Sequence, residues 1–153
     1  MRTGVRLGID VGKARIGVAR SDQHGMLATP VETVARGTGD IARIVAIASE
    51  LEAFEIVVGL PLALSGNETA STQDAKDFAL DLLAAVGVPV RMVDERLSTV
   101  SAGRALQASG RNTKKQRPVI DQVAAVIILQ HALDFERSGG QTPGTLLDPD
   151  EGQ

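Results

Sequence analysis

The sequence predicts an α/β fold: a mixed five-stranded sheet that begins with an antiparallel hairpin and carries helices on both faces. Two observations predict it. Two short apolar segments, 6–11 and 16–20, flank a tight turn near the start of the chain. From residue 40 onward, helical and strand patterns alternate, which is typical of a sheet with parallel strands. The hairpin therefore supplies the antiparallel part of the sheet, and the later strands supply the parallel part.

The first three strands form the antiparallel part. Residues 6–11 and 16–20 make a hairpin whose turn contains Gly12 and Lys13. Residues 26–34 predict a third strand, and it lies at the edge of the sheet because Pro30 has no N–H to donate to a neighbour.

The remaining elements alternate. Apolar residues at helical spacing predict a helix from Asp40 to Leu51, with Asp40 as its N-cap. The apolar segment 55–61 is typical of a buried parallel strand. The pattern then predicts, in order, a helix closed by Gly87, a strand over 88–96, a helix over 98–108, a basic loop over 111–118 and a helix over 119–135.

The chain of 153 residues predicts one domain, residues 1–137, followed by a Gly- and Pro-rich tail, 138–153, that we expect to be disordered. There is no cysteine, which excludes disulfides, thiol nucleophiles and Cys-ligated zinc. No apolar run approaches the roughly 18 residues that span a membrane, so we expect a cytoplasmic protein with no membrane partner.

Charge restricts how the protein could bind nucleic acid. The net charge of −3 matches the three acids of the tail, so the rest of the chain is neutral and any phosphate-binding surface must be local. The chain has no Tyr or Trp, which argues against base stacking on an aromatic platform. A cluster of cations precedes the predicted last helix and consists of Arg111, Lys114, Lys115 and Arg117. This cluster is either a solvated face or a contact for a phosphate backbone.

Acidic residues stand where the sheet should bind ligands. Asp10 lies near the end of the first strand, Asp94 and Glu95 end the fifth, and Asp121 opens the last helix. Ligands of open α/β sheets collect at the carboxyl ends of the strands, so these acids could converge on a divalent cation. Taken singly, each acid is also explained as a turn, surface or helix-start residue. His24 and His131 have no ligand or triad partner nearby in the sequence.

The opening "GIDVGKARIGVA" resembles the first phosphate loop of actin-like ATPases and sugar kinases. Those enzymes close two related domains around ATP. This chain has length for one domain and no second copy of the opening, which argues against an enzyme of that kind.

Five ordered blocks resemble the YqgF-type family of pre-16S rRNA nucleases, also called Holliday-junction resolvase-like proteins. The resemblance covers about residues 5–135, with Ser101 as a departure where an acid is expected, and its blocks are GIDVGKARIGVARSD, VVGLPLALSGNE, DERLST, SGRNTKKQRPVID and DQVAAVIILQHAL. It implies an RNase H-like fold and a divalent metal, Mg²⁺ or Mn²⁺. The residues implied as metal ligands and catalytic groups are Asp10, Glu95 and Asp121, and those implied to face substrate phosphates are Lys13, Arg15 and Arg96.

The strand neighbours Asp94 and Glu95 point to opposite faces, and the sequence leaves open which of them faces the metal. Three functions follow. The first is an endonuclease that processes the 5′ end of pre-16S rRNA. The second is a homodimeric resolvase of four-way DNA junctions, because paired cuts need two sites related by a two-fold axis. The third is a non-catalytic RNA-binding module.

Overall fold

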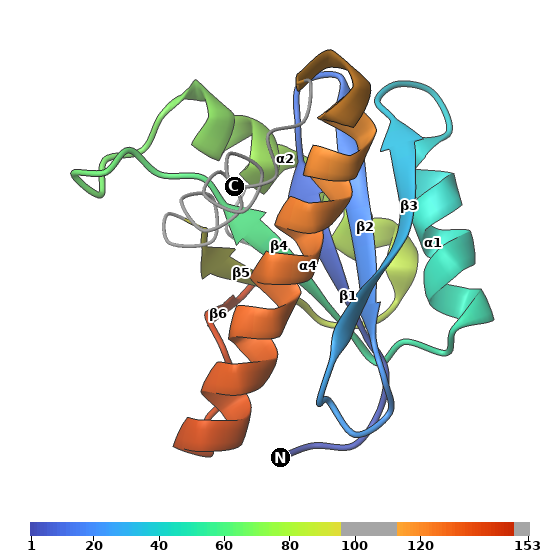
Figure 1. The fold of residues 1–153 in the computed structure, drawn as a ribbon, viewed down its shortest axis with the longest axis vertical. Helices are drawn as coiled ribbons and strands as arrows, with labels where there is room; N and C mark the ends of the chain where they lie inside the picture. The colour runs from blue at the N-terminus through green and yellow to red at the C-terminus, as the bar shows by residue number, and fades with distance from the viewer. Residues whose placement is uncertain (96–112, 149–153) are drawn as a thin grey trace.

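The computed structural model describes residues 1–95 and 113–148, with side chains for 1–95 and 122–148. Six strands form one sheet in the order β3-β2-β1-β4-β5-β6 (Figure 1). The strands are β1 Arg6–Val11, β2 Arg15–Ser21, β3 Ala28–Ala35, β4 Glu55–Leu60, β5 Val90–Asp94 and β6 Thr145–Leu146. The helices are α1 Asp40–Glu50, α2 Ala70–Val86 and α4 Thr113–Gly139. The helix expected over 98–108 falls outside the described residues.

The sheet has the mixed topology that the sequence predicts. Strands β1, β2 and β3 pair antiparallel, with β3 at the edge, whereas β1, β4 and β5 pair parallel to one another. The expected number of five strands is wrong. The sixth strand, β6, pairs antiparallel with β5 through Arg91 opposite Leu146 and Met92 opposite Thr145. A two-residue strand has no detectable period of its own, so alternation in the sequence could not reveal it.

We expected the tail, residues 138–153, to be disordered, but residues 138–148 are ordered. Helix α4 continues to Gly139, and the chain then returns to the sheet. The Leu147 side chain is only 6% exposed, and its backbone N–H donates to the Val90 carbonyl at 2.8 Å. The open edge of β5 supplies these partners, and the composition of the tail carries no sign of them.

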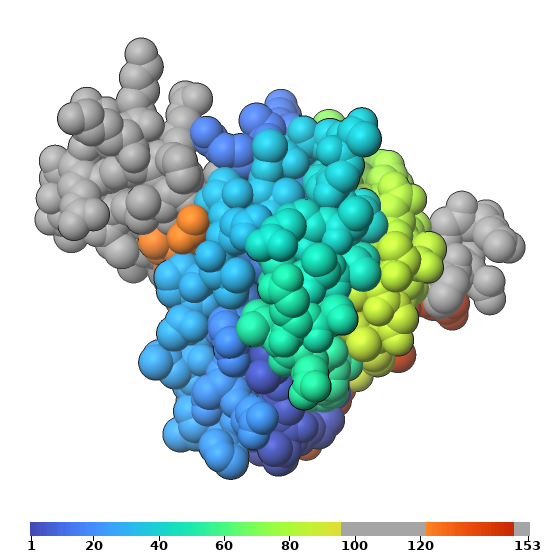
Figure 2. Space-filling view, turned by 90° about the vertical axis from the view of Figure 1, so that its right-hand side faces the viewer, coloured from blue at the N-terminus to red at the C-terminus, as the bar shows by residue number. Residues whose placement is uncertain are grey.

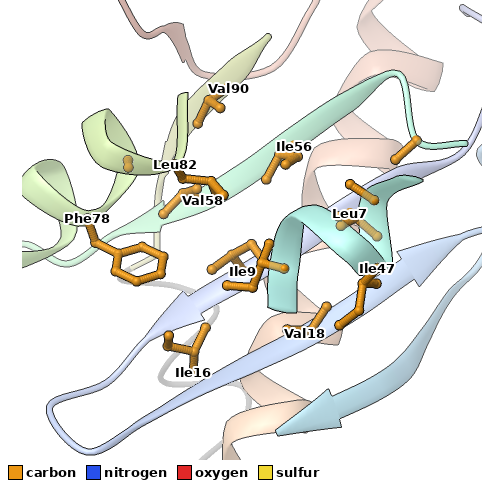
Figure 3. Packing of buried hydrophobic residues seen from close by; sticks show 14 of the residues in the cluster. Leu7, Ile9, Ile16, Val18, Ile47, Ile56, Val58, Phe78, Leu82 and Val90 are labelled. Carbon is orange, nitrogen blue, oxygen red and sulfur yellow. The ribbon is translucent and has the colours of Figure 1, made fainter. Parts of the chain in front are cut away.

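Helices cover both faces of the sheet, as expected. Figure 1 shows α4 in front of the sheet with α1 and α2 behind it. Figure 2 shows the opposite layer, where α1 lies between β3 and α2. The main core fills the space between the sheet and the α1–α2 layer (Figure 3). A capping box begins α2: the Thr69 side chain accepts from the Thr72 N–H, and the Thr72 side chain accepts from the Thr69 N–H.

Helix α4 packs against the other face of the sheet. A Cβ at Gly8 would lie 2.6 Å from the Leu129 Cβ and 2.9 Å from the Ala125 carbonyl oxygen, so α4 crosses β1 where the strand has no side chain. The prediction of a basic loop over 111–118 is wrong from residue 113 onward, because the backbone there is already helical. We expected the helix to start beside Pro118, but a helix can contain a proline if it forgoes one hydrogen bond. None of the described helices is long and apolar enough to cross a membrane.

Candidate active site

The carboxyl ends of the three parallel strands lie at one edge of the sheet. Asp10 is the penultimate residue of β1, and Glu95 directly follows β5. The backbone N–H of Glu95 donates to the Leu60 carbonyl at the end of β4, at 3.2 Å. This bond prolongs the pairing of β4 with β5 by one residue and places Glu95 beside the end of the central strands.

Alternation along the strands decides which acid faces Asp10. On β5, Val93 packs into the small core beneath α4, and Glu95 follows two residues later on the same face of the sheet. Asp94 points to the other face and is exposed. Glu95 and Asp10 are both half-buried and share a side-chain hydrogen bond. The structure therefore brings Glu95, and not Asp94, against Asp10.

Gly59 of β4 provides the space for the Glu95 carboxylate. A Cβ at Gly59 would collide with the Glu95 Oε2 atom and would lie 2.6 Å from the Ile128 Cδ1 atom of α4. Any side chain at this position would have to displace both the Glu95 carboxylate and the end of the Ile128 side chain. Gly59 is not among the residues predicted for the site, although a glycine inside an apolar strand is a signal of close approach.

The surroundings of Glu95 disfavour its charged form. Burial, followed by the charge of Asp10, their shared hydrogen bond and the charge of Asp94, raises the pKa of Glu95 to about 8. At neutral pH the pair therefore retains one proton, which the two carboxyl groups share. If both carboxyl groups lost their protons, their negative charges would repel each other. A divalent cation bound between them would offset this repulsion and replace the shared proton.

This donor set fits a hard divalent cation. Carboxylate oxygens are the ligands that Mg²⁺ and Mn²⁺ prefer, and one or two carboxylates are enough when water and phosphate complete the coordination. No group of three possible ligand side chains occurs within the described residues. The third predicted ligand, Asp121, lies in α4 four residues before Ala125, but its side chain is outside the described part of the chain.

The predicted phosphate-binding residues are only partly described. Lys13 is exposed in the turn between β1 and β2, and Arg15 begins β2 half-buried. Both therefore flank the strand that carries Asp10. Arg96 and Arg111 lie outside the described residues. The other three predicted phosphate-binding residues lie in the first turns of α4, and only their backbone is described: Lys114, Lys115 and Arg117.

Comparison with known proteins identifies the family. The model of the RuvX family, described as Holliday junction resolvase, matches residues 4–135. The chain belongs to the RuvX family. RuvX is another name for the YqgF-type family, so the family predicted from the sequence is confirmed.

Curated relatives of this RuvX-family protein carry the name "Putative pre-16S rRNA nuclease". One from Clavibacter michiganensis subsp. michiganensis is 64% identical, over 98% of both chains. Another from Leifsonia xyli subsp. xyli is 63% identical, over 97% of both chains. Both the family description and this name denote enzymes that cleave phosphodiester bonds in nucleic acid. The predicted class, an endonuclease with a nucleic-acid substrate, is confirmed.

Solved structures confirm the predicted RNase H-like fold class. A structure described as "T. thermophilus RuvC in complex with Holliday junction substrate" matches with a TM-score of 0.58 at 20% identity, covering 92% of this chain and 99% of that chain. A second structure, of Thermus thermophilus RuvC, matches with a TM-score of 0.56, also at 20% identity, covering 94% of this chain and 99% of that chain. At this level of identity the likeness concerns the fold alone.

Proposed function

We propose that this protein is a metal-dependent endonuclease that processes the 5′ end of pre-16S rRNA in the cytoplasm. Asp10, Glu95 and Asp121 are the proposed ligands of Mg²⁺ or Mn²⁺. The observation that carries the proposal is the contact between Asp10 and Glu95, two acids far apart in the sequence, at the edge where sheets of this type bind ligands. The curated relatives support pre-16S rRNA as the substrate.

Helical periodicity supports Asp121 as the third ligand. Position 121 precedes Ala125 by four residues and Ile128 by seven, and both of these pack beneath the sheet face that carries Asp10 and Glu95. Residues at this spacing share one side of a helix. One turn before Ala125, α4 would therefore present position 121 toward the same edge of the sheet.

The proposed chemistry assigns a role to each residue. Asp10 and Glu95 hold the cation, and Glu95 gives up its proton when the cation binds. A divalent cation, when bound, makes water a stronger nucleophile and stabilises the negative charge that develops on the phosphate. Lys13 and Arg15 bind neighbouring phosphates of the substrate, together with Arg96 and the cations at the start of α4, and so orient the scissile bond.

Cleavage assays with charge-neutral variants test the proposal. Loss of an outer-shell partner of a metal ligand typically costs about 10- to 100-fold in activity. We expect Asp10→Asn and Glu95→Gln each to reduce Mg²⁺-dependent cleavage of a pre-16S rRNA 5′ leader by at least that much, because each removes a direct ligand. Asp94→Asn is the matched control, since it removes the neighbouring acid on the opposite face, and it should retain most of the activity. Full activity of Asp10→Asn in the same assay would contradict the proposal.

Metal binding is measurable without a substrate. We expect Mg²⁺ or Mn²⁺ to raise the melting temperature of the wild-type protein, because a ligand of the native state stabilises it. The Asp10→Asn variant should lose this shift but keep its RNA affinity. RNA binding by wild-type protein with no thermal shift at millimolar metal would favour the non-catalytic RNA-binding module instead.

Resolution of four-way DNA junctions by a homodimer is the second candidate function. The description of the family model favours it, and the likeness to a RuvC bound to a Holliday junction agrees with it at the level of fold. Cleavage of the rRNA leader and of a synthetic four-way junction, compared at equal protein and salt concentrations, distinguishes the two. Paired cuts in the junction by a protein that sediments as a dimer would replace the rRNA proposal.

A further inference from the structure

Arg36 lies directly after β3, and its side chain joins the β1–β2 turn to helix α2. Its Nη1 atom donates to the Gly12 carbonyl at 2.8 Å and to Asp74 Oδ2 at 2.9 Å. Its Nη2 atom donates to Asp74 Oδ1 at 3.1 Å. The guanidinium also lies 5.3 Å from the ring centre of Phe78. One side chain therefore connects three segments that are distant in the sequence.

The β1–β2 turn depends on Arg36 for two of its hydrogen bonds. Besides the bond to Gly12, the backbone N–H of Arg36 donates to the Ala14 carbonyl at 2.9 Å. Within the turn, the Gly12 N–H donates to the Arg15 carbonyl, also at 2.9 Å. Arg36 thus binds the turn on both sides of Lys13, which is itself exposed.

Asp74 fixes the guanidinium in its position. Two parallel hydrogen bonds to one carboxylate are the geometry that arginine favours and lysine cannot reproduce. The hydrogen bonds and charge of Arg36 lower the pKa of Asp74, and the nearby charge of Lys13 lowers it further. Asp74 is therefore ionised at neutral pH, and it lies close enough to Lys13 for the charge of Lys13 to lower its pKa.

We propose that Arg36 is a positioning residue for substrate binding, held in place by Asp74. It fixes the β1–β2 turn so that Lys13 and Arg15 face the phosphates of the nucleic acid. The inference rests on the proposed function, because it assigns these two cations to the substrate. Asp10 lies within the paired part of β1, opposite Gly17, and its place does not depend on this contact.

This role predicts a specific kinetic signature. When the turn loses its support, Lys13 and Arg15 spend less time in the binding orientation, so KM rises. The carboxylate site is unchanged, so kcat and the Mg²⁺ concentration for half-maximal activity stay near the wild-type values. A merely structural role would instead lower the melting temperature and the fraction of active protein at unchanged KM.

The chain offers a matched control for the loss of an arginine. Arg43 makes a similar two-bond pair with Glu32, at 2.9 and 2.7 Å, on the same side of the sheet. Its described contacts do not include the turn. Arg43→Gln therefore removes one positive charge and one bidentate pair while leaving the turn as it is.

The experiment compares Arg36→Gln, Arg36→Lys and Arg43→Gln in the full chain. With the rRNA leader as substrate, we expect Arg36→Gln to raise KM about five- to tenfold and to reduce the salt dependence of RNA binding by about one phosphate contact. Arg36→Lys retains the charge but not the paired geometry, and it should restore less than half of the lost affinity. Hydrogen exchange in residues 12–15 should accelerate in both Arg36 variants and stay unchanged in Arg43→Gln.

The possible outcomes are distinct. Wild-type KM in Arg36→Gln, or equal effects of Arg36→Gln and Arg43→Gln, would overturn the positioning role while leaving the nuclease proposal intact. Full restoration by Arg36→Lys would show that the charge acts directly, which also overturns it. If Arg36→Gln does not fold, Arg36→Lys with its exchange measurement decides. A wild-type protein that neither cleaves nor binds the leader would refute the proposed function, and this inference with it.

Discussion

The fold holds the Glu95 carboxyl group in surroundings that disfavour its charged form. Its pKa of about 8 lies well above the ordinary value of 4.5, so between these pH values the folded protein binds a proton that the unfolded chain releases. The free energy of unfolding therefore falls as the pH rises from about 4.5 to 8. Metal binding at neutral pH should release this proton.

The pH dependence of stability due to Glu95 can be measured in the metal-free protein. We expect the metal-free wild-type protein to lose stability as the pH rises from about 5 to 8, and Glu95→Gln to lose much less, because the amide does not ionise. Denaturant unfolding in the presence of EDTA measures both. In Asp94→Asn, the free energy of unfolding should still fall as the pH rises, as it does in the wild type. Parallel curves for the wild type and Glu95→Gln would mean that Glu95 is not the group that takes up the proton.

At the scale of elements, the distance between α4 and the sheet determines the site. The helix supplies the small core that carries Ala125, Ile128 and Leu129, and it approaches β1 directly over Gly8. Gly59 extends this line of close approach toward Glu95. If α4 moved away from the sheet, position 121 would move with it, because a helix shifts as a rigid unit.

We therefore predict that Gly8→Ala is destabilising by about 1–3 kcal/mol, the usual range for overpacking. The added methyl group would lie 2.9 Å from the Ala125 carbonyl oxygen, and backbone cannot yield as a flexible side chain can. Gly139→Ala is the control, since a Cβ there meets nothing within 4 Å. Chemical denaturation measures both, and a Gly8→Ala protein as stable as the wild type would contradict the close packing.

For the molecule as a whole, a largely buried network of charges lies at the end of the sheet opposite the acids. Arg2 donates to Glu55 at 2.8 Å and to Glu136 of α4 at 2.6 Å. Arg6 also donates to Glu136, at 2.9 Å, and Arg91 donates to Glu55, at 2.8 Å. The network joins the N-terminal segment, the starts of the parallel strands and the last turns of α4. It thereby anchors the helix at the end far from position 121.

This network should dominate acid unfolding. Burial alone would raise the pKa of Glu136, but the hydrogen bonds and charge of Arg2, with the charge of Arg6, outweigh it and lower the pKa to about 2. The resulting stability is complete above about pH 4.5 and is lost as the pH falls toward 2. We expect Glu136→Gln to lose about 3 kcal/mol at neutral pH.

A surface pair provides the comparison for Glu136. Glu32→Gln breaks the exposed pair with Arg43, and such pairs contribute at most about 1 kcal/mol. Urea unfolding at pH 7 and pH 3 tests the contrast. Equal losses in the two variants at pH 7 would show that the buried network adds no more than an exposed ion pair.

The sequence by itself determined the elements and the kind of site. Spacing of apolar residues is a local property, so the hairpin, α1, α2 and the parallel strands could be predicted from it. The rule that ligands bind at the carboxyl ends of parallel strands predicts that Asp10 and the pair Asp94 and Glu95 lie at one edge of the sheet. The same local patterns could not reveal β6, whose pairing partner is the distant edge of β5.

Only the tertiary structure decided the contacts. The choice of Glu95 over Asp94 depends on the register of β5 against β4, and the raised pKa depends on burial beneath α4. The link from Arg36 to Gly12 and Asp74 joins three separate segments. Distances between residues remote in the sequence arise when the sheet and helices pack, and no local pattern encodes them.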